Sequence, residues 1–302
     1  MPNLKEVRKQ TSKARQLMFR ANQQKFAVGA FNIDSQDILI SIMEAAAKLK
    51  APVIINLSAA ELDAIGMENA RDLVDNYKEE LGVEAYLNLD HGPTVKLAKE
   101  AIDAGFEFVH IDISQEDHSA PLSEIITKTK QVTQYARFTG AIVESEMHYF
   151  AGSSNLHEDE FDYEEIKKEF SKPETSQDFV RQTDVDIFAA SVGNLHGKYP
   201  VPKQLDLTLL QEVCQALPSS VSLHGGSGTP LFYFEEASKI GVSKININTD
   251  VRIAHRRALE RELKDNPDQY SVMKLMKEVN KATQKVIEEK IIAFGSEGKA
   301  LL

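Results

Sequence analysis

The sequence has a single cysteine, Cys214, in 302 residues. One thiol cannot form a disulfide within the chain, and it rules out zinc sites that require several cysteines. A reducing cytoplasm is therefore the expected compartment. The first twenty residues are interrupted repeatedly by lysine and arginine, so they lack the apolar core of a signal peptide.

Long apolar runs and an excess of basic residues are also missing. No stretch of about 18 uninterrupted apolar residues, the length that a membrane helix needs, occurs in the sequence. The net charge is -11, whereas nucleic-acid binders select clustered lysine and arginine. We therefore expect a soluble protein without a membrane or nucleic-acid partner.

What the sequence does contain is a regular alternation of short apolar segments with segments of helical spacing. This alternation is typical of parallel β/α units, and the length suits one complete barrel. We predict an α/β fold, a single TIM (β/α)8 barrel with an N-terminal helix and a C-terminal helical extension, and one domain over residues 1–302. The candidate strands are residues 27–32, 52–57, 85–89, 108–112, 141–146, 187–191, 221–223 and 244–246.

One segment breaks this rhythm. Residues 153–176, between the fifth and sixth candidate strands, are rich in Glu, Asp and Lys. A barrel loop of this length is commonly a lid or an ordered insertion, so we predict that residues 147–176 form an active-site lid or an insertion. The apolar spacing of residues 272–292 predicts a long closing helix.

Three of the eight histidines end a candidate strand and precede a glycine. They are His91, His196 and His224. Catalytic groups of TIM barrels converge at the carboxyl ends of the strands, where three imidazoles can bind zinc and leave a fourth position open. A single histidine of this kind is more often a hydrogen-bonded core or rim residue, but three in the same position favour a metal site.

The other histidines lack this position. His110 lies within a strand without a following glycine, so we interpret it as a core or rim histidine. His118, His148, His157 and His255 lack the strand-end context, although His148 and His157 could reach the site from the loop.

Carboxylates gather at the same predicted rim. Asp90 precedes His91 and is a natural proton carrier, the alternative being that it orients an imidazole. Asp112 and Glu146 end the fourth and fifth strands and could take up the cation in a second position or hold the histidines. Glu144 lies two residues before Glu146, on the same side of the strand.

Two segments after the seventh and eighth strands predict a phosphate site. Residues 224–228 are His-Gly-Gly-Ser-Gly, and residues 244–250 end a strand where a helix begins. Barrels commonly bind phosphate at these loops through backbone amides and a helix N-terminus. One glycine-rich loop is usually only a turn, but two beside a metal site are more specific, and Gly197 could add another amide.

These motifs, in this order, resemble the class II fructose-bisphosphate aldolase family, which includes tagatose-bisphosphate aldolases. The resemblance covers nearly the whole chain. It is carried by the segments Gly29-Ala30-Phe31-Asn32, Asn88-Leu89-Asp90-His91, His110-Ile111-Asp112-Ile113-Ser114, Val143-Glu144-Ser145-Glu146, Gly193-Asn194-Leu195-His196-Gly197, Leu223 to Gly228, Lys244 to Asp250 and Phe294 to Ala300.

The resemblance implies zinc on His91, His196 and His224, with Asp112 and Glu146 at the second cation position. It is also compatible with a different divalent cation in place of zinc, and with a monovalent cation in addition. It implies that Asp90 exchanges a proton with the C4 hydroxyl or the aldehyde. The residues implied to hold dihydroxyacetone phosphate are Gly197, Gly225, Gly226, Ser227, Asn246, Ile247, Asn248 and Thr249.

The chain departs from the family after the fifth strand. Family members usually continue with Glu-Leu-Gly and a Gly-Gly-x-Glu-Asp loop whose glutamate carries the second proton. Here Glu146 is followed by Met-His-Tyr-Phe-Ala-Gly-Ser-Ser, without an acid at that spacing. Glu158, Asp159 and Glu160 follow a few residues later, so a shifted lid could supply the acid.

The expected function is zinc-dependent, reversible aldol cleavage of a ketose 1,6-bisphosphate, with fructose 1,6-bisphosphate as the first candidate. The products would be dihydroxyacetone phosphate and glyceraldehyde 3-phosphate. A tagatose-bisphosphate or other ketose-phosphate aldolase, a metal-dependent sugar-phosphate isomerase or epimerase, and a non-catalytic sugar-phosphate-binding protein are the alternatives. The resemblance suggests a homodimer or homotetramer.

Overall fold

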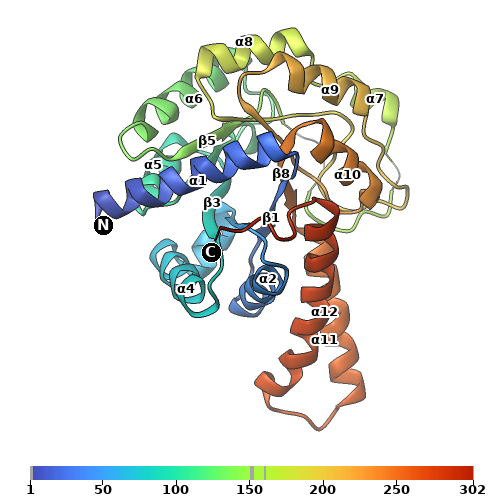
Figure 1. Ribbon diagram of the computed structural model, residues 1–302. Helices are drawn as coiled ribbons and strands as arrows, with labels where there is room; N and C mark the ends of the chain where they lie inside the picture. Colours follow the sequence, from blue (N-terminus) through green and yellow to red (C-terminus); the bar gives the residue numbers. More distant parts are fainter. Residues whose placement is uncertain (1–2, 150–152, 160, 302) are drawn as a thin grey trace.

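The computed structural model describes residues 3–149, 153–159 and 161–301. Eight parallel strands pair in chain order, and β8 pairs with β1, so the sheet closes into a barrel (Figure 1). The predicted TIM (β/α)8 barrel is therefore confirmed. The strands are β1 (Val28–Asn32), β2 (Val53–Leu57), β3 (Ala85–Gly92), β4 (Phe108–Ile111), β5 (Ile142–Ser145), β6 (Ile187–Ala189), β7 (Ser220–Leu223) and β8 (Val242–Ile247).

Helices cover the outside of this barrel, and α11 and α12 form a hairpin that projects away from it (Figure 1). The predicted N-terminal helix and C-terminal helical extension are both present. The helices are α1 (Leu4–Gln24), α2 (Gln36–Leu49), α3 (Ala59–Ile65), α4 (Met67–Leu81), α5 (Val95–Asp103), the 3₁₀ turn η1 (Ile113–Gln115), α6 (Leu122–Ala136), α7 (Tyr163–Lys167), α8 (Pro173–Thr183), α9 (Leu207–Ala216), α10 (Leu231–Ile240), α11 (Thr249–Asp265) and α12 (Val272–Ala293).

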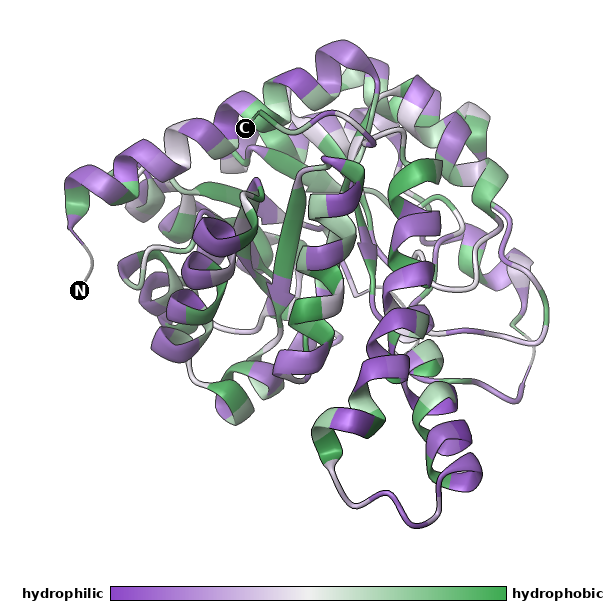
Figure 2. Cartoon of the chain, turned by 60° about the horizontal axis from the view of Figure 1, so that its bottom comes forward, coloured by the Kyte–Doolittle hydropathy of each residue, from purple (hydrophilic) through white to green (hydrophobic). Residues whose placement is uncertain are grey.

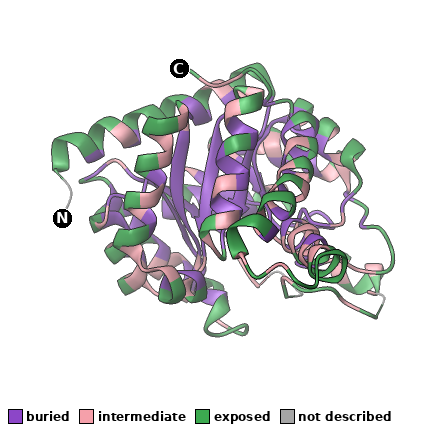
Figure 3. Ribbon diagram, turned by 90° about the horizontal axis from the view of Figure 1, so that it is seen from below, coloured by how far each residue is buried: buried purple, intermediate pink, exposed green. Residues whose placement is uncertain are grey.

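The N-terminal end of the barrel is closed by α1. Its buried residues Ala14, Leu17 and Ala21 pack with inward-facing side chains such as Ile54 and Phe108 in one apolar cluster. The strands are largely buried, while the surrounding helices expose one face (Figure 3), and the same helices carry hydrophilic residues outward (Figure 2). Since one end is plugged by apolar side chains, the opposite, carboxyl end is where polar groups can gather.

The inward-facing side chains of β3 and β4 become more polar toward the carboxyl ends of these strands. Side chains two residues apart share a face of a strand, so Tyr86 and Asn88 follow one another along β3, and Phe108 and His110 along β4. The apolar member of each pair belongs to the cluster under α1, and the polar member is fully buried above it. Buried polar groups are costly unless they are paired, which explains why the barrel interior contains a hydrogen-bonded polar network.

The predicted lid, residues 147–176, is partly regular structure. It contains the short helix α7, and its last four residues are the first turn of α8. Pro173 occupies the start of α8, where its missing N–H costs no hydrogen bond. The irregular part of the insertion therefore ends at residue 172. Among the described residues, no helix is both long enough and apolar enough to span a membrane.

Candidate active site

Asp90 and His91 reach the same site through an irregularity in β3. The β3–β4 register shifts between Leu89 and Gly92, and His91 adopts a left-handed conformation with φ 49°. In a regular strand, neighbouring side chains point to opposite faces, and a bulge changes that direction. A Cβ atom on Gly92 would lie 3.1 Å from the His110 carbonyl oxygen, so glycine fits this close approach.

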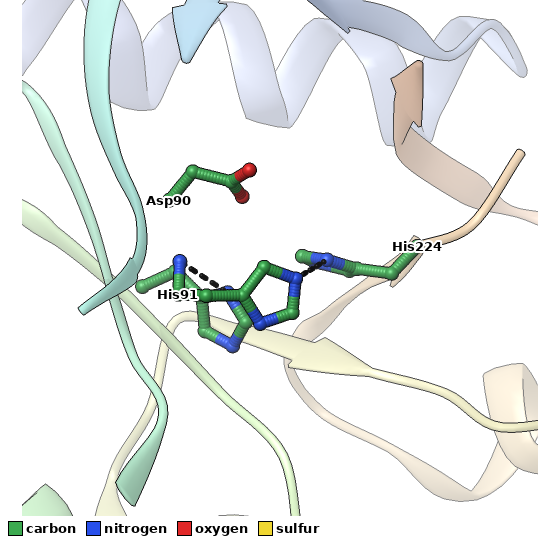
Figure 4. A group of neighbouring side chains, drawn as sticks. Asp90, His91 and His224 are labelled. Atoms are coloured by element: carbon green, nitrogen blue, oxygen red, sulfur yellow. Dashed lines mark hydrogen bonds between the residues drawn. The ribbon is translucent and has the colours of Figure 1, made fainter. Parts of the chain in front are cut away.

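The imidazoles of His91 and His224 face each other, with Asp90 beside them (Figure 4). His91 Nε2 lies 2.9 Å from His224 Nδ1. The remaining nitrogen of each ring is held by a carboxylate, His91 Nδ1 by Asp112 at 2.5 Å and His224 Nε2 by Glu144 at 2.7 Å. Carboxylates orient metal-binding histidines in this way.

The separation of these two nitrogens suits a shared cation. Two imidazole nitrogens on one tetrahedral zinc ion are roughly 3.3 Å apart, given zinc–nitrogen bonds of about 2.0–2.1 Å. The observed 2.9 Å is close to that value. His91 and His224 therefore fit a divalent metal.

His196, the third predicted ligand, lies close to both of these rings. Its ring centroid is 4.9 Å from that of His91 and 6.2 Å from that of His224. Burial, together with His91 and His224, lowers the pKa of His196 to about 3, so the ring is neutral, the form that binds metal. The structure thus brings the three predicted histidines to one place.

His110 also belongs to this site, although its sequence context indicated only a core or rim role. Its ring centroid lies 4.5 Å from that of His91 and 4.7 Å from that of His224. Its Nε2 is 3.6 Å from Glu146 Oε2, and within the described chain neither buried atom has a hydrogen-bond partner. Buried polar atoms without a partner mark a place where a bound ligand or cation would be accommodated. The sequence feature that indicates this position is the two-residue spacing between His110 and Asp112, which places both side chains on one face of the strand.

Two groups of potential ligands emerge from the described residues. In each group the ligand atoms all lie within 4.8 Å of one another, and His196 belongs to neither. The groups are Asp90, His91, His110 and His224, and His91, His110, Asp112 and Glu146.

The two carboxylates predicted for a second cation position differ in their surroundings. Asp112 accepts hydrogen bonds from His91, from the Ser114 amide at 3.1 Å and hydroxyl, and from Gln115 at 2.8 Å. Burial and the neighbouring Asp112 raise the pKa of Glu146 well above its usual range. Glu146 is therefore the carboxyl that gains most from a nearby cation, whereas Asp112 is already occupied in orienting His91.

Asp90 is held between two amides. Asn246 donates to its Oδ1 at 2.9 Å, and Asn32 donates to its Oδ2 at 3.0 Å. Burial opposes its ionisation, but the surrounding basic groups His91, His224, Lys244 and His110 together outweigh burial and lower the pKa of Asp90. An oriented, ionised carboxylate beside the histidines can accept a proton from a substrate hydroxyl.

A small cavity joins this carboxylate to the predicted phosphate residues. Its volume is about 30 Å³. The α11 N-terminus borders it, since Thr249 lines the cavity; Asn248 makes no side-chain cap to the helix, and the Asp250 amide donates to the Ser227 hydroxyl at 3.0 Å. Ile247 is buried and does not line it. The lining residues are Asn32, Asp90, His91, Ser154, His196, Gly197, His224, Gly225, Gly226, Ser227, Asn246, Asn248 and Thr249.

The lid loop, which we define as residues 153–159 of the predicted lid, borders the cavity at Ser154. Leu156 forms a β-bridge with Lys198, and the His157 ring stacks on Tyr199 at 4.3 Å. Of the lid residues predicted as acids, Glu158 and Asp159 are exposed and do not line the cavity, and Glu160 lies outside the described residues. The residue of the lid loop that lines the cavity is Ser154.

A parallel barrel that carries a histidine and carboxylate cluster at its carboxyl rim, next to a helix N-terminus, has the arrangement typical of metal-dependent enzymes that act on anionic substrates. Comparison with known proteins narrows this class. The family model for class II fructose-bisphosphate aldolase matches residues 12–299. The chain belongs to this family and is an aldolase, a lyase.

Individual relatives agree with this assignment and differ in substrate. The chain is 31% identical to a fructose-bisphosphate aldolase from Geobacillus stearothermophilus, over 95% of this chain and 97% of that protein. It is 29% identical to a sulfofructosephosphate aldolase from Alkalicoccus urumqiensis, over 94% and 96%. The crystal structure of the YdjI aldolase from Escherichia coli K12 superposes with a TM-score of 0.79 at 26% identity, covering 95% and 98%.

Proposed function

We propose that the chain catalyses zinc-dependent, reversible aldol cleavage of a ketose 1,6-bisphosphate, with fructose 1,6-bisphosphate as the preferred substrate. The products are dihydroxyacetone phosphate and glyceraldehyde 3-phosphate. The observation that carries the proposal is the position of Asp90, whose carboxylate shares one cavity with His91, His224 and the α11 N-terminus. A proton acceptor, metal-binding side chains and an anion site thus lie within reach of one small substrate.

His91, His196 and His224 would hold the cation, and His110 and Glu146 lie next to it. When bound, a divalent cation supplies a Lewis acid that withdraws electrons from the substrate ketone. Asp112 and Glu144 keep the rings of His91 and His224 in place through hydrogen bonds of 2.5 and 2.7 Å. Metal affinity therefore depends on these two carboxylates as well as on the ligands.

A phosphate cradle would anchor the C1 phosphate. We define it as Gly197, Gly225, Gly226, Ser227, Asn246, Ile247, Asn248 and Thr249. The α11 N-terminus contributes backbone amides and the positive end of the helix dipole. Anchoring one end of the ketose fixes the C3–C4 bond beside Asp90, which converts binding energy into orientation.

In the cleavage direction Asp90 accepts the proton of the C4 hydroxyl. The C3–C4 bond breaks, its electron pair remains on C3 and is delocalised toward the C2 carbonyl, and C4 leaves as the aldehyde carbon. C3 then takes up a proton to give dihydroxyacetone phosphate. We propose that this second proton comes from the lid, with Glu158, Asp159 and Glu160 as the candidate donors when the lid rearranges over bound substrate.

A substrate panel tests the proposal. Zinc-loaded protein is incubated with fructose and tagatose bisphosphates, the corresponding ketose monophosphates and sulfofructose phosphate, and triose release is measured. The proposal predicts the highest kcat/KM for fructose 1,6-bisphosphate. Interconversion of ketose phosphates without triose release would identify an isomerase or epimerase instead, and binding without turnover would identify a sensor.

The molecule as a whole carries two further proposals. We propose that residues 1–302 act as one domain in the cytoplasm, and that the chain assembles into a homodimer or homotetramer. The tip of the α11–α12 hairpin supports the second proposal, because Tyr270 and Met273 are 85% and 80% exposed there. Exposed apolar residues on a projecting element are typical of contact surfaces.

A further inference from the structure

Lys203 has an unusual environment beside the phosphate cradle. Its side chain is 1% exposed, and its ammonium group lies within hydrogen-bond distance of four backbone carbonyl oxygens, which share its three N–H groups. The acceptors are Leu195 at 2.5 Å, Gly197 at 2.5 Å, Gly225 at 2.8 Å and Ser227 at 2.6 Å.

This carbonyl cage belongs to the two loops that follow β6 and β7. Leu195 and Gly197 flank His196, and Gly225 follows His224 directly. Gly197, Gly225 and Ser227 also line the candidate active-site cavity. The ammonium therefore ties together the two loops that supply metal-binding histidines and phosphate contacts.

A cation is required at the centre of this cage. Four carbonyl oxygens that converge on one point repel each other, and rings of backbone carbonyls are the ligands that proteins offer to alkali-metal ions. A neutral amine would direct its lone pair at an oxygen, so the cage favours the charged form against burial, which lowers the pKa of Lys203 to about 7.

Among the described residues, Lys203 forms no ion pair with a carboxylate. Asp250, the carboxylate whose charge acts on Lys203, is already engaged by Lys290 at 2.8 Å and Lys198 at 3.5 Å. Three lysine charges thus act in the region of one aspartate. The anion that balances this excess positive charge would be the substrate phosphate.

We propose that Lys203 acts as a tethered monovalent cation, which positions the two loops of the phosphate cradle and supplies the positive charge that an alkali-metal ion would otherwise provide there. This inference rests on the proposed phosphate site. In this proposal, the Lys203 ammonium group takes the place of the additional monovalent cation that the family resemblance implied.

Phosphate binding to the zinc-loaded wild-type protein provides the first test. Calorimetric titration with inorganic phosphate and with dihydroxyacetone phosphate is carried out in potassium, sodium and tetramethylammonium chloride at equal ionic strength. We expect the dissociation constants to agree within about 2-fold, since the cage is already filled. A requirement for potassium or sodium would overturn the proposal, and this test needs no variant.

The variant Lys203→Ala empties the cage. In tetramethylammonium chloride it should bind phosphate roughly 10-fold or more weakly, the effect of losing charge-assisted hydrogen bonds. Potassium or ammonium ions should restore most of the affinity, whereas a purely structural side chain would not be replaced selectively by small cations. Lys203→Met, which fills the side-chain space without a charge, should show the loss with little rescue.

Lys198→Met is the matched control, because it removes a positive charge near Asp250 without touching the cage. It should weaken phosphate binding only modestly and show no dependence on the cation. Equal phosphate affinity in Lys203→Ala and wild type would overturn the role of Lys203 and leave the aldolase proposal intact. Failure of the wild type to bind phosphate in any salt would contradict the proposed function itself.

Discussion

Asp90 illustrates what individual residues contribute to the site. Its carboxylate is oriented by Asn32 and Asn246 and lies beside His91 and His224. If it accepts the C4 hydroxyl proton, Asp90→Ala should lower kcat by about 10² or more while the zinc content stays unchanged. Steady-state kinetics and metal analysis check this outcome. A near-normal kcat would remove Asp90 from its catalytic role.

Glu144 acts through its neighbours. It accepts hydrogen bonds from His224 and from the Ser222 hydroxyl, and it pairs with Lys244 at 2.6 Å, with both side chains fully buried. Glu144→Gln should lower zinc affinity by about 10- to 100-fold. It should also lower Tm, because the buried charge of Lys244 loses its partner.

A double variant separates these two effects. Glu144→Gln combined with Lys244→Met removes the unpaired charge, so Tm should recover in part while zinc affinity stays low. Competition with a chelating dye measures the affinity. Wild-type zinc affinity in the double variant would show that Glu144 does not position His224.

At the residue scale, the sequence was informative where position in a strand determines direction. Placing His91, His196 and His224 at strand ends was sufficient to predict that they converge, and the structure brings their rings together. The sequence predicted only a core or rim role for His110, because no glycine turn follows it. Its two-residue spacing from Asp112, which puts both side chains on one face of the strand, is the feature that indicates a place in the site. Lys203 left no signal, since its four acceptors are backbone atoms that only the fold brings together.

At the scale of elements, all eight predicted strands are present within a few residues. The alternation of apolar segments and helical spacing reports burial directly, which is why it predicts the barrel. The bulge at His91 extends β3 beyond its predicted end, and the path of the lid depends on the bridge between Leu156 and Lys198. Both are tertiary features that local patterns do not encode.

We propose that the lid moves during turnover. The closed cavity of about 30 Å³ is far smaller than the roughly 300 Å³ or more of ordinary ligand pockets. The loop rests on Gly197, where a Cβ atom would lie 2.5 Å from the Ser153 carbonyl oxygen and 2.6 Å from that of Asn155. Gly197→Ala should therefore prevent closure, raise KM, lower kcat and expose the lid to proteolysis, with zinc content unchanged.

Gly82→Ala is the control for backbone strain. Gly82 has φ 64°, comparable with the 85° of Gly197, but open space surrounds its Cβ position. Each variant should lose about 1–2 kcal/mol of unfolding free energy because alanine is forced into the left-handed region. Only Gly197→Ala should change the kinetics and the cleavage of the lid, and equal behaviour of the two variants would argue against lid closure.

At the scale of the whole molecule, the barrel separates stability from chemistry. The apolar cluster under α1 closes one end, so substitutions there should affect folding. The polar network at the other end unites the proposed metal ligands, the proposed proton acceptor and residues of the proposed phosphate cradle around one cavity. Family membership and this arrangement support one account, in which the chain is a metal-dependent ketose-bisphosphate aldolase.

The measurement that tests this account most directly is triose release from fructose 1,6-bisphosphate before and after removal of metal. Protein treated with a chelator and dialysed should lose activity, and added Zn²⁺ or Co²⁺ should restore it, because the chain offers histidine ligands in place of a Schiff-base lysine. Full activity in protein shown by metal analysis to be free of divalent cations would contradict the account.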